Sequence, residues 1–519
     1  MEATRRNFVQ GGAVVAGALA VSGAATTAFA GEEAWDEEYD VVVVGGGLAG
    51  TATAVTVATE GAGATCLLLE KGSDKDGNGN SRFSAGNIWT TDNYDAALDY
   101  MKALRGSNTS VSDAICEAYV REMTQHADWL RSLGAPDDMV VSYESEDFSY
   151  DAEYPELDPQ KSSHGIKFSS DNPDGYTHPQ LFLSAKVDEF DTITRKLEAP
   201  ATELVQDPET KAILGVVYEC EGKTVRAKAN KGVVMCCGGF EGSPEMMTSV
   251  FKAYGAHPAA GKCNTGDGIK MCAKVGANMW HMGGMAGFWP NHVSLDGERY
   301  SINTQSGTFE QGIMVGTNGR RFFMEWHSYG REQEAEELRC RVGMRHGDTQ
   351  YGGEWCHTML PEVYWFVFDQ NGLDNGALTK LGSEDPVEDG WGYRADTLEE
   401  LAEQMDVPAD ELVATVNNWN RMCDEGCDFA FYRPASTLNK IEVGPFYATK
   451  MCQHFINTDG GAERDEYGHI LDTDGNIIPG LYGAGEFGSI WSDMYNGGGN
   501  LGECLAFGRI SARNCLGIA

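Results

Sequence analysis

Residues 39–50 read YDVVVVGGGLAG, and this stretch decides the fold. An unbroken apolar run ends at Val44, as in a strand that is buried on both faces of a parallel sheet. Gly45, Gly47 and Gly50 follow in the order G-x-G-x-x-G, and a helical pattern continues to Glu60. A second apolar strand spans 65–69. Strand, glycine turn, helix and strand in this order predict a dinucleotide-binding unit.

Each part of this motif has a physical role. Gly45 permits the tight turn, Gly47 lets the backbone approach a pyrophosphate, and Gly50 lets the helix pack closely on the strand. The amide groups that begin the helix have no partners inside it and carry partial positive charge, which suits phosphate. The second strand ends in Glu70, an acid at the position that binds ribose hydroxyls in such units.

Further glycine-rich and polar stretches continue outward from this unit. They occupy residues 79–81, 84–86, 233–240, 264–268, 319–325, 480–486, 497–502 and 507–510. In this order they resemble the flavoprotein subunits of the fumarate reductase and succinate dehydrogenase superfamily, which includes urocanate reductase and the 3-ketosteroid dehydrogenases. The resemblance covers nearly the whole mature chain. It departs at Met324, where the family segment G-x-R-F-x-N-E has Asn.

The resemblance implies that the cofactor is FAD and not NAD. Together with the glycine motif, it assigns cofactor binding to residues from both ends of the chain. These are Gly45, Gly47, Leu48, Ala49, Gly50, Glu70, Lys71, Asn80, Ser81, Ser84, Ala85, Gly86, Ala201, Gly238, Gly239, Asp267, Gly485, Glu486, Asn500 and Leu501.

The expected fold class is α/β, a Rossmann-like FAD-binding domain with an inserted α+β cap domain for the substrate. Strands are expected near 39–44, 65–69, 212–219 and 232–237. Residues 36–284 and 436–519 form the two parts of the FAD domain in this interpretation, and 285–435 form the cap, with hinges near 283–287 and 432–445. In the cap, Thr397 and Glu400 form a capping box, and a helical pattern runs from Ala409 to Met422.

The first 30 residues are interpreted as an export signal and not as part of the fold. They carry twin arginines, Arg5 and Arg6, then a weakly apolar run rich in Ala and Gly, and a small-x-small cleavage site that ends at Ala30. This pattern resembles a twin-arginine (Tat) signal, which exports proteins already folded around a cofactor. The alternative is an N-terminal membrane anchor, for which the run is short and poor in Leu and Ile. The expected location is periplasmic or otherwise extracytoplasmic, with membrane association left open.

Charge and cysteine spacing exclude several classes of protein. The net charge of −39 repels phosphate backbones, so nucleic acid is not an expected partner. The same charge either attracts a basic partner or serves only solubility. The 14 cysteines contain no C-x-x-C pair, which argues against covalent haem and gives no support to a metal site. Cys423 and Cys427 lie four residues apart near the end of a helical pattern, where a disulfide or metal pair is an alternative to two unpaired thiols.

Relatives of the reductase type transfer hydride from reduced flavin to an activated alkene while an acid protonates the other carbon, and the family resemblance implies the same chemistry here. Fumarate reductases hold carboxylates with two arginines and two histidines. The corresponding stretches of this sequence have neither, and the position expected for the acidic arginine falls near Leu373. A larger, less charged substrate is therefore expected, bound by Phe288, Trp289, Asn457 and Asn496.

Four residues are candidates for proton transfer. Tyr495 is the first, because its turn abuts the flavin in the family and its phenol can donate a proton; the alternative is an aromatic ring that packs on the flavin edge. Arg331 and His327 follow Glu325 closely and can form a relay. Glu325 either moves protons or pairs with an arginine, and Arg321 is expected to be structural.

Three functions stay open. The first is an extracytoplasmic reductase of a C=C bond that acts as a terminal respiratory enzyme. Its electrons come from an external donor, a cytochrome or a membrane quinol dehydrogenase, because no haem or FMN-attachment domain is seen in the sequence. The second is a dehydrogenase of the 3-ketosteroid type that runs in the opposite direction. The third is a flavin electron-transfer protein, against which the tryptophan-rich cap argues.

Overall fold

A computed structural model describes most of the chain. The described residues are 34–135, 140–142, 154, 157–168, 178–285, 287–300, 309–322, 324–325, 351–352, 357–358, 361–378, 381, 383–492 and 494–518. The expected export signal lies outside them. In the part of the chain that is described, no helix has both the length and the apolar character needed to cross a membrane.

The apolar run before the glycine motif forms β1, Glu37–Val44, in the middle of the first sheet. Parallel partners flank it on both sides: β2 (Cys66–Leu69), then β6 (Ile193–Lys196), and on the other side β9 (Lys223–Met235), then β21 (Ile477–Gly483). Antiparallel strands complete the sheet: β20 (His469–Leu471), β8 (Ile213–Cys220) and β7 (Ala201–Gln206). Val41 and Val43 face one core while Val42 and Val44 face another, so β1 is buried on both faces.

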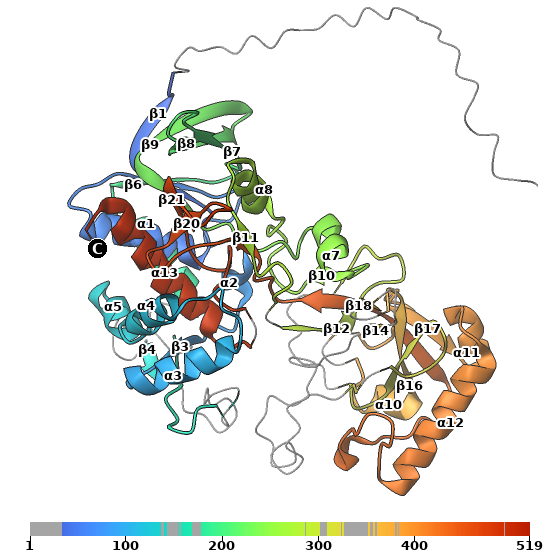
Figure 1. Cartoon of the computed structure of the whole chain (residues 1–519). Coiled ribbons are helices and arrows are strands. Elements are labelled where there is room, and N and C mark those ends of the chain that lie inside the picture. Colours follow the sequence, from blue (N-terminus) through green and yellow to red (C-terminus); the bar gives the residue numbers. More distant parts are fainter. Residues whose placement is uncertain are drawn as a thin grey trace, which may run out of the picture. The chain divides into compact units, whose positions relative to one another are not determined.

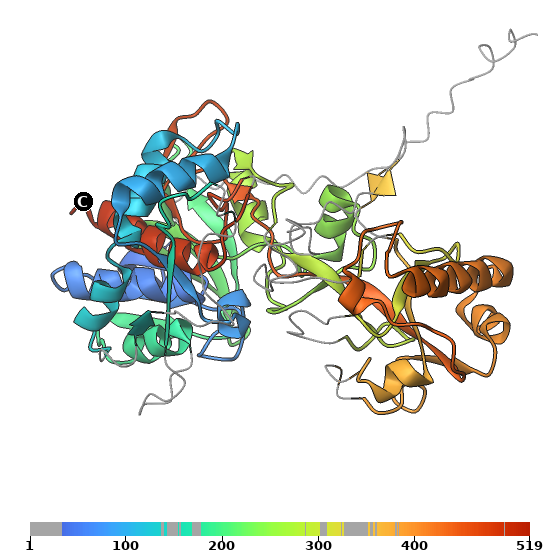
Figure 2. The same cartoon turned by 90° about the horizontal axis from the view of Figure 1, so that it is seen from below.

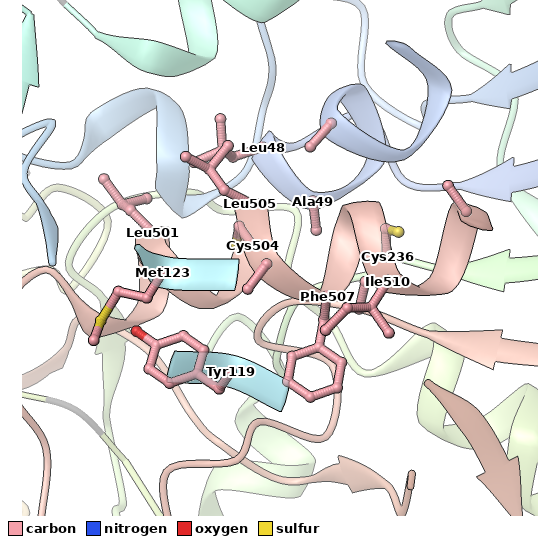
Figure 3. Packing of buried hydrophobic residues seen from close by; sticks show 14 of the residues in the cluster. Leu48, Ala49, Tyr119, Met123, Cys236, Leu501, Cys504, Leu505, Phe507 and Ile510 are labelled. Carbon is pink, nitrogen blue, oxygen red and sulfur yellow. The ribbon is translucent and has the colours of Figure 1, made fainter. Parts of the chain in front are cut away.

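Two helices from opposite ends of the chain cover one face of this sheet (Figure 1). They are α1, Leu48–Glu60, and α13, Gly499–Leu516. Figure 3 shows Leu48 and Ala49 of α1 beside Leu505 of α13, in the same buried cluster. Small residues allow this close contact, since a side-chain carbon on Gly508 would lie 3.0 Å from the carbonyl oxygen of Ala49.

The glycine turn has the geometry that its sequence predicts. Gly45 has a φ of +108°, and a side-chain carbon there would lie 2.2 Å from the carbonyl oxygen of Cys236. A side-chain carbon on Gly50 would lie 1.8 Å from the carbonyl oxygen of Gly45. Neither position accepts another residue, because backbone occupies the space. The first turn of α1 is thereby held directly against the end of β1.

The remaining elements of this half surround the sheet. The helices are α2 (Asn80–Phe83), α3 (Tyr94–Arg105), α4 (Asp113–Met123), α5 (His126–Ser132), α6 (Pro179–Val187), α7 (Pro244–Phe251) and α8 (Asp267–Lys274). A small sheet joins β3 (Ile88–Thr90), β5 (His164–Phe168) and β4 (Val140–Ser142), and β11 (Met279–Trp280) pairs with β19 (Gly461–Ala462). Side-chain oxygens cap three of these helices: Asn93 caps α3, Ser112 caps α4 and Ser243 caps α7.

The second sheet is mainly antiparallel. Its strands are β10 (His257–Pro258), β12 (Phe288–His292), β13 (Ile313–Gly316), β16 (Tyr364–Asp369), β17 (Gly392–Ala395) and β18 (Phe446–Phe455). Helices α11 (Leu398–Met405) and α12 (Ala409–Glu425) lie side by side next to β17 and β18 in Figures 1 and 2. The short helix α10 (Gln370–Asp374) follows β16, and β14 (Tyr351–Gly352) pairs with β15 (His357–Thr358).

The expected helices of this region are confirmed. The Thr397 hydroxyl accepts a hydrogen bond from the Glu400 amide at 3.2 Å and caps α11. The predicted pattern from Ala409 forms α12, which buries Leu412, Val416 and Trp419. The fold class is confirmed as α/β with a Rossmann-like sheet and a second α+β unit.

The cap domain was expected to end at residue 435, but the last strand of the second sheet, β18, follows that residue. Strand β18 pairs with β10, β12, β16 and β17, so the chain stays in this sheet until Phe455. The sequence of β18 could not show to which sheet the strand belongs, because a strand buried on both faces is equally apolar in either sheet. Strand β10 also precedes the expected limit of 284 and belongs to the second sheet.

Candidate active site

A deep cavity opens where the parallel strands of the first sheet end. Such strand ends are where α/β sheets bind ligands, because the loops there diverge. The cavity is lined by the glycine turn, the start of α1, the end of β2, the segment 79–87, residues 199–201, the turn after β9, the loop before α8, and the start of α13. Residues far apart in the chain therefore meet at one site.

Most of the residues assigned to cofactor binding line this cavity. They are Gly45, Gly47, Leu48, Ala49, Glu70, Lys71, Asn80, Ser81, Ser84, Ala85, Gly86, Ala201, Gly238, Asp267, Glu486, Asn500 and Leu501. Three others lie behind the lining, where they hold its shape. Gly50 packs on Gly45, Gly239 on Thr458 and Glu241, and Gly485 on Ala49 and Cys504.

The cavity suits a dinucleotide that carries a pyrophosphate. The starts of α1 and α13 both line it, and each brings the positive end of a helix dipole. A side-chain carbon on Gly47 would meet only the Ser81 hydroxyl, at 3.3 Å, so this glycine leaves open space that a larger residue would fill. The Glu70 carboxylate accepts hydrogen bonds from the amides of Gly46, at 2.9 Å, and Gly72, at 2.7 Å, which fixes it at the cavity wall.

Two buried oxygens of the cavity lining have no hydrogen-bond partner among the residues that the structure describes. They are Oδ1 of Asn457 and Oδ1 of Asn500, and both residues line the cavity. The other side of the Asn457 amide donates to Asp459 at 3.2 Å, which orients the free oxygen. Buried acceptors without donors are rare in folded proteins, so these two oxygens fit a bound group with N–H or O–H donors.

Two neighbouring carboxylates, the buried Glu241 and the half-buried Glu486 of the cavity lining, share the same donors. The Asn80 amide nitrogen donates to Glu241 at 2.7 Å and to Glu486 at 3.0 Å. The Asn264 amide nitrogen does the same, at 2.6 Å and 3.2 Å. Burial raises the pKa of Glu241, and burial together with the charge of Glu241 holds the pKa of Glu486 well above its usual range. Because the negative charge of Glu241 raises the pKa of Glu486, the two acids favour a state in which one of them keeps a proton.

More acids adjoin this pair. Asp459 is buried, and burial with the charges of Glu503 and Glu241 holds its pKa well above the ordinary value. Glu503 is also buried but is paired with the guanidinium of Arg464 and accepts from the Ser489 hydroxyl at 2.7 Å. Arg464 in turn donates to the carbonyl oxygen of Gly485 at 3.1 Å, which fixes the turn beside the cavity.

The sequence did not identify Glu241, Asn264 or Thr458 as site residues. Thr458 donates to Glu241 at 3.1 Å and accepts from the amide of Phe240 at 2.8 Å. One signal was available, because Glu241 is an acid directly after the glycine turn that ends β9, at the edge of the sheet where ligands bind. Nothing in the sequence indicates that this acid meets Asn80 and Glu486.

Only some of the candidate residues for substrate binding and proton transfer line the cavity. Tyr495 and Asn457 line the cavity. The Tyr495 hydroxyl accepts a hydrogen bond from the Asn500 amide at 3.3 Å, and its ring packs edge-on against Trp491. Asn496 is buried behind the wall, where it accepts from the Tyr100 hydroxyl at 2.8 Å. Phe288 and Trp289 lie in β12, but their side chains are outside the described residues, as are His327 and Arg331.

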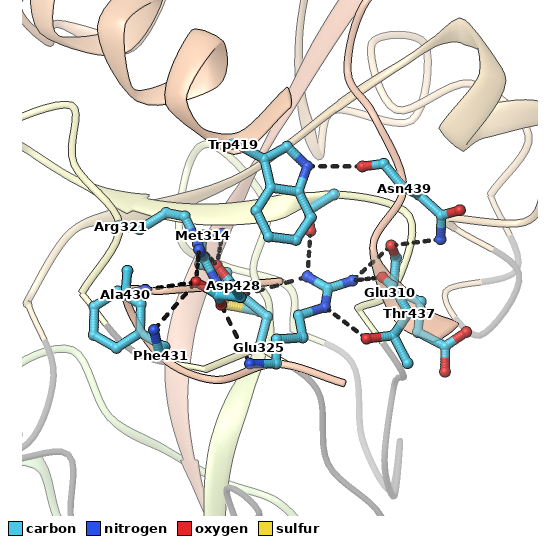
Figure 4. A network of polar contacts seen from close by, with 12 residues as sticks. Glu310, Met314, Arg321, Glu325, Trp419, Asp428, Ala430, Phe431, Thr437 and Asn439 are labelled. Carbon is cyan, nitrogen blue, oxygen red and sulfur yellow. Dashed lines mark hydrogen bonds and ion pairs between the residues drawn. The ribbon is translucent and has the colours of Figure 1, made fainter. Parts of the chain in front are cut away.

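Glu325 belongs to a buried ion network of the second unit and does not line the cavity. Figure 4 shows Glu325 and Asp428 beside Arg321. Arg321 donates to both oxygens of Glu325, at 2.7 and 2.6 Å, and to Asp428 at 3.0 Å. Arg433 adds a contact to Glu325 at 3.4 Å, and the amide of Met314 adds one at 3.1 Å. This arrangement gives Arg321 the structural role expected for it and shows Glu325 paired with arginines.

The described residues form neither a metal site nor a disulfide bond. No group of His, Cys, Asp or Glu side chains in that part of the chain is arranged to hold a metal ion. Cys423 and Cys427, the candidate pair, are both free thiols.

Comparison with known proteins yields a family and a fold. A family model described as FAD binding domain matches residues 40–501. The 3-oxosteroid 1-dehydrogenase of Mycobacterium tuberculosis is 32% identical over 309 residues, 55% of this chain and 52% of that protein, so the match spans about half of that relative. The vinyl phenol reductase of Lactiplantibacillus plantarum is 25% identical over 503 residues, 92% of this chain and 95% of that protein.

Among solved structures, the 3-ketosteroid delta1-dehydrogenase of Sterolibacterium denitrificans aligns with a TM-score of 0.67 at 21% identity, over 93% of this chain and 100% of that one. At this identity the likeness shows the fold alone. It agrees with the two-unit α/β architecture described above.

The raised pKa values of Glu241 and Glu486 predict how the stability of the protein depends on pH. Raised pKa values mean that the folded protein binds more protons than the unfolded chain, so stability is highest below the ordinary glutamate range and falls as pH rises. In the FAD-free protein, Glu241→Gln should therefore reduce the loss of unfolding free energy between about pH 5 and pH 8 by roughly 1 kcal/mol or more. Denaturant unfolding at both pH values measures this.

The matched control for this prediction is Glu203→Gln, an exposed acid on β7. It should leave the pH dependence unchanged. If Glu241→Gln loses as much stability between the two pH values as the native protein does, the pKa of Glu241 is not raised in the folded protein.

Proposed function

The chain belongs to the FAD binding domain family, and from this premise we propose that it is an FAD-dependent oxidoreductase that reduces an activated C=C bond of a non-fumarate, apolar or aromatic substrate. FAD is its cofactor. When bound, FAD supplies hydride transfer, and the protein supplies binding, orientation and proton control. The relative with the most complete overlap among those described, vinyl phenol reductase, supports this substrate class because it aligns over nearly the full length of both chains.

One observation carries the choice against a dicarboxylate. The described residues that line the cavity include no arginine and no histidine. The one cation among them, Lys71, is paired with Asp267 at 2.5 Å and donates to the Thr265 hydroxyl at 2.7 Å. A fumarate-like substrate brings two negative charges that need desolvated cationic partners. The lining also holds the acids Glu70, Asp267 and Glu486, which repel a dicarboxylate, whereas its amides, phenol and apolar side chains suit a less charged alkene.

The residues of the site have complementary tasks in this proposal. The start of α13, with Asn500 and Leu501, offers a positive dipole end that stabilises negative charge in the cavity. Tyr495 stands beside it as the proton donor to the substrate carbon. The acid pair of Glu241 and Glu486 retains a proton close to the cavity wall.

The second candidate function is a dehydrogenase of the 3-ketosteroid type. The observation that favours it is the 32% identity to a 3-oxosteroid 1-dehydrogenase, although over about half of that protein. The chemistry runs in the opposite direction at the same kind of site. An electron-transfer protein without a substrate is a weaker candidate, because two acceptors of the cavity lining have no partner in the described part of the chain and fit a ligand.

An anaerobic assay tests the proposed function. FAD-loaded protein would be mixed with reduced methyl viologen and fumarate, urocanate, cinnamates or steroid enones. Rapid oxidation of viologen by an apolar or aromatic alkene, with none by fumarate, is the expected result. Fumarate turnover would overturn the substrate class. Turnover of saturated ketones with an artificial acceptor, in place of any alkene reduction, would establish the dehydrogenase.

Tyr495 generates a specific prediction. Tyr495→Phe removes the hydroxyl and keeps the ring that packs on Trp491, so the FAD content should stay normal while turnover of the best alkene falls about 100-fold. Steady-state kinetics and flavin absorbance measure the two quantities. Tyr467→Phe, a half-exposed tyrosine near β20, is the control. Native-like turnover in Tyr495→Phe would reduce Tyr495 to a packing role.

We also propose that the protein is exported folded by the Tat pathway and receives electrons from an external donor, a cytochrome or a membrane quinol dehydrogenase. The twin arginines and the weakly apolar run support export, and the acidic charge supports docking to a basic partner. Changing Arg5→Lys together with Arg6→Lys should leave folded, FAD-containing protein in the cytoplasm. Cell fractionation measures this, and unchanged export of the double variant would reject the pathway.

A further inference from the structure

A buried glutamine lies directly behind the glycine turn. Gln180 belongs to the first turn of α6, and its side chain is fully buried. Helix α6 packs on α1, and its residues Phe182, Leu183 and Val187 belong to the same buried cluster as α1. The glycine turn lines the cavity, whereas Gln180 does not. The packing of α6 therefore holds a polar side chain behind the part of the wall that the turn forms.

Both ends of the Gln180 side-chain amide have partners. Its Nε2 donates a hydrogen bond to the carbonyl oxygen of Gly46 at 3.0 Å, and the hydroxyl of Thr51 donates to its Oε1 at 3.4 Å. On the other side the chain closes over the amide, since a side-chain carbon on Gly77 would lie 3.0 Å from Nε2. A buried amide is costly unless it is hydrogen-bonded, so these two contacts set its orientation.

The contact with Gly46 fixes the peptide group that joins Gly46 to Gly47. This peptide is trans, so its C=O and N–H point in opposite directions. Because the carbonyl is aimed at Gln180, the N–H of Gly47 points to the opposite side. Gly46 and Gly47 both line the cavity and Gln180 lies behind them, so that side is the cavity. The N–H of Gly47 therefore brings a partial positive charge to the place where a phosphate binds.

This peptide needs an anchor because a glycine stands on each side of it. Without side-chain carbons, the peptide can rotate at little steric cost. A rotated peptide would turn its carbonyl oxygen, the negative end, toward the phosphate. The neighbouring amides have anchors of their own. The amide of Gly46 donates to the Glu70 carboxylate at 2.9 Å. The amide of Leu48 donates to the Ser81 hydroxyl at 3.0 Å. Gln180 is the corresponding anchor of the peptide between them.

We propose that Gln180 is a positioning residue for the cofactor, which holds the peptide between Gly46 and Gly47 with its N–H toward the pyrophosphate and its carbonyl away from it. The inference goes beyond the proposed function, because it rests on FAD binding and on no particular substrate. Gln180 acts through the glycine turn and lies outside the cavity lining. Its contribution should therefore depend on the pyrophosphate of the ligand and not on the adenosine part.

Calorimetric titration of the FAD-free protein separates these two parts of the cofactor without turnover. The ligands are FAD, then ADP, which keeps the pyrophosphate, and adenosine, which lacks it. Gln180→Met keeps the length of the side chain and removes the donor. This variant should bind FAD and ADP about tenfold more weakly than the native protein, the loss of about one hydrogen bond, and should bind adenosine equally well.

Gln180→Glu tests whether the donor itself matters. Glutamate has the shape of glutamine, but it donates a hydrogen bond only while its carboxyl is protonated. Gln180→Glu should therefore bind ADP more tightly than Gln180→Met, and this advantage should grow as the pH falls from about 8 to about 5. Titratable groups around the site, among them Glu70, Asp76 and His178, are present in both variants, so the ratio of the two affinities removes their effect.

Gln206→Met is the matched control. Gln206 ends β7, and its Nε2 also donates to backbone carbonyl oxygens, those of Lys211 at 2.9 Å and Val275 at 3.2 Å, but away from the glycine turn. The same substitution there should leave the affinity for all three ligands unchanged. Circular dichroism and the unfolding midpoint verify the folding of each variant. If Gln180→Met does not fold, Gln180→Glu is compared with the native protein over the same pH range.

Each outcome decides one claim. Native-like affinity of Gln180→Met for ADP overturns the role of Gln180. An equal loss of ADP and adenosine affinity also overturns it, because the damage would then be general to the site. Equal ADP affinity of Gln180→Glu and Gln180→Met at every pH overturns the role of the donor. All three results leave the proposed function standing. A native protein that binds FAD but reduces no alkene of the panel fails the proposed function and leaves this inference intact.

Discussion

The close approach of α1 to the end of β1 is the constraint on which the rest of the structure depends. At Gly50 the helix touches the carbonyl oxygen of Gly45, and no side chain fits between them. This contact aims the free amides of the first turn into the cavity. It also brings α1 within reach of α13, so the last helix of the chain completes a site that the first helix begins.

Several acidic side chains lie beside the cavity that this contact shapes. A cofactor with a pyrophosphate requires positive helix ends and an uncluttered backbone. Among the described residues, no cation pairs with Glu241 or Glu486. Glu241 and Glu486 share the amides of Asn80 and Asn264, while Glu503 is neutralised by Arg464. The raised pKa values of Glu241 and Glu486 therefore link the free energy of unfolding to pH.

The sequence predicted what is local and missed what depends on distant partners. The strand, glycine turn and helix of residues 39–60 follow from steric rules that act within a few residues, and the cap of α11 also depends only on neighbouring residues. The placement of β18 and the position of Glu241 beside Glu486 depend on contacts between residues far apart in the chain. Asn496, expected to bind substrate, supports the wall from behind, because its turn directs it toward Tyr100.

The most direct test of this account is the flavin content of a single variant. Gly47 faces open cavity and touches no backbone, so Gly47→Val should fold but fill the space that the pyrophosphate needs. Absorbance of the purified proteins gives the ratio of FAD to chain. The account predicts about one FAD per chain in the native protein and nearly none in Gly47→Val, with secondary structure unchanged by circular dichroism. A folded Gly47→Val protein with full FAD content would contradict it.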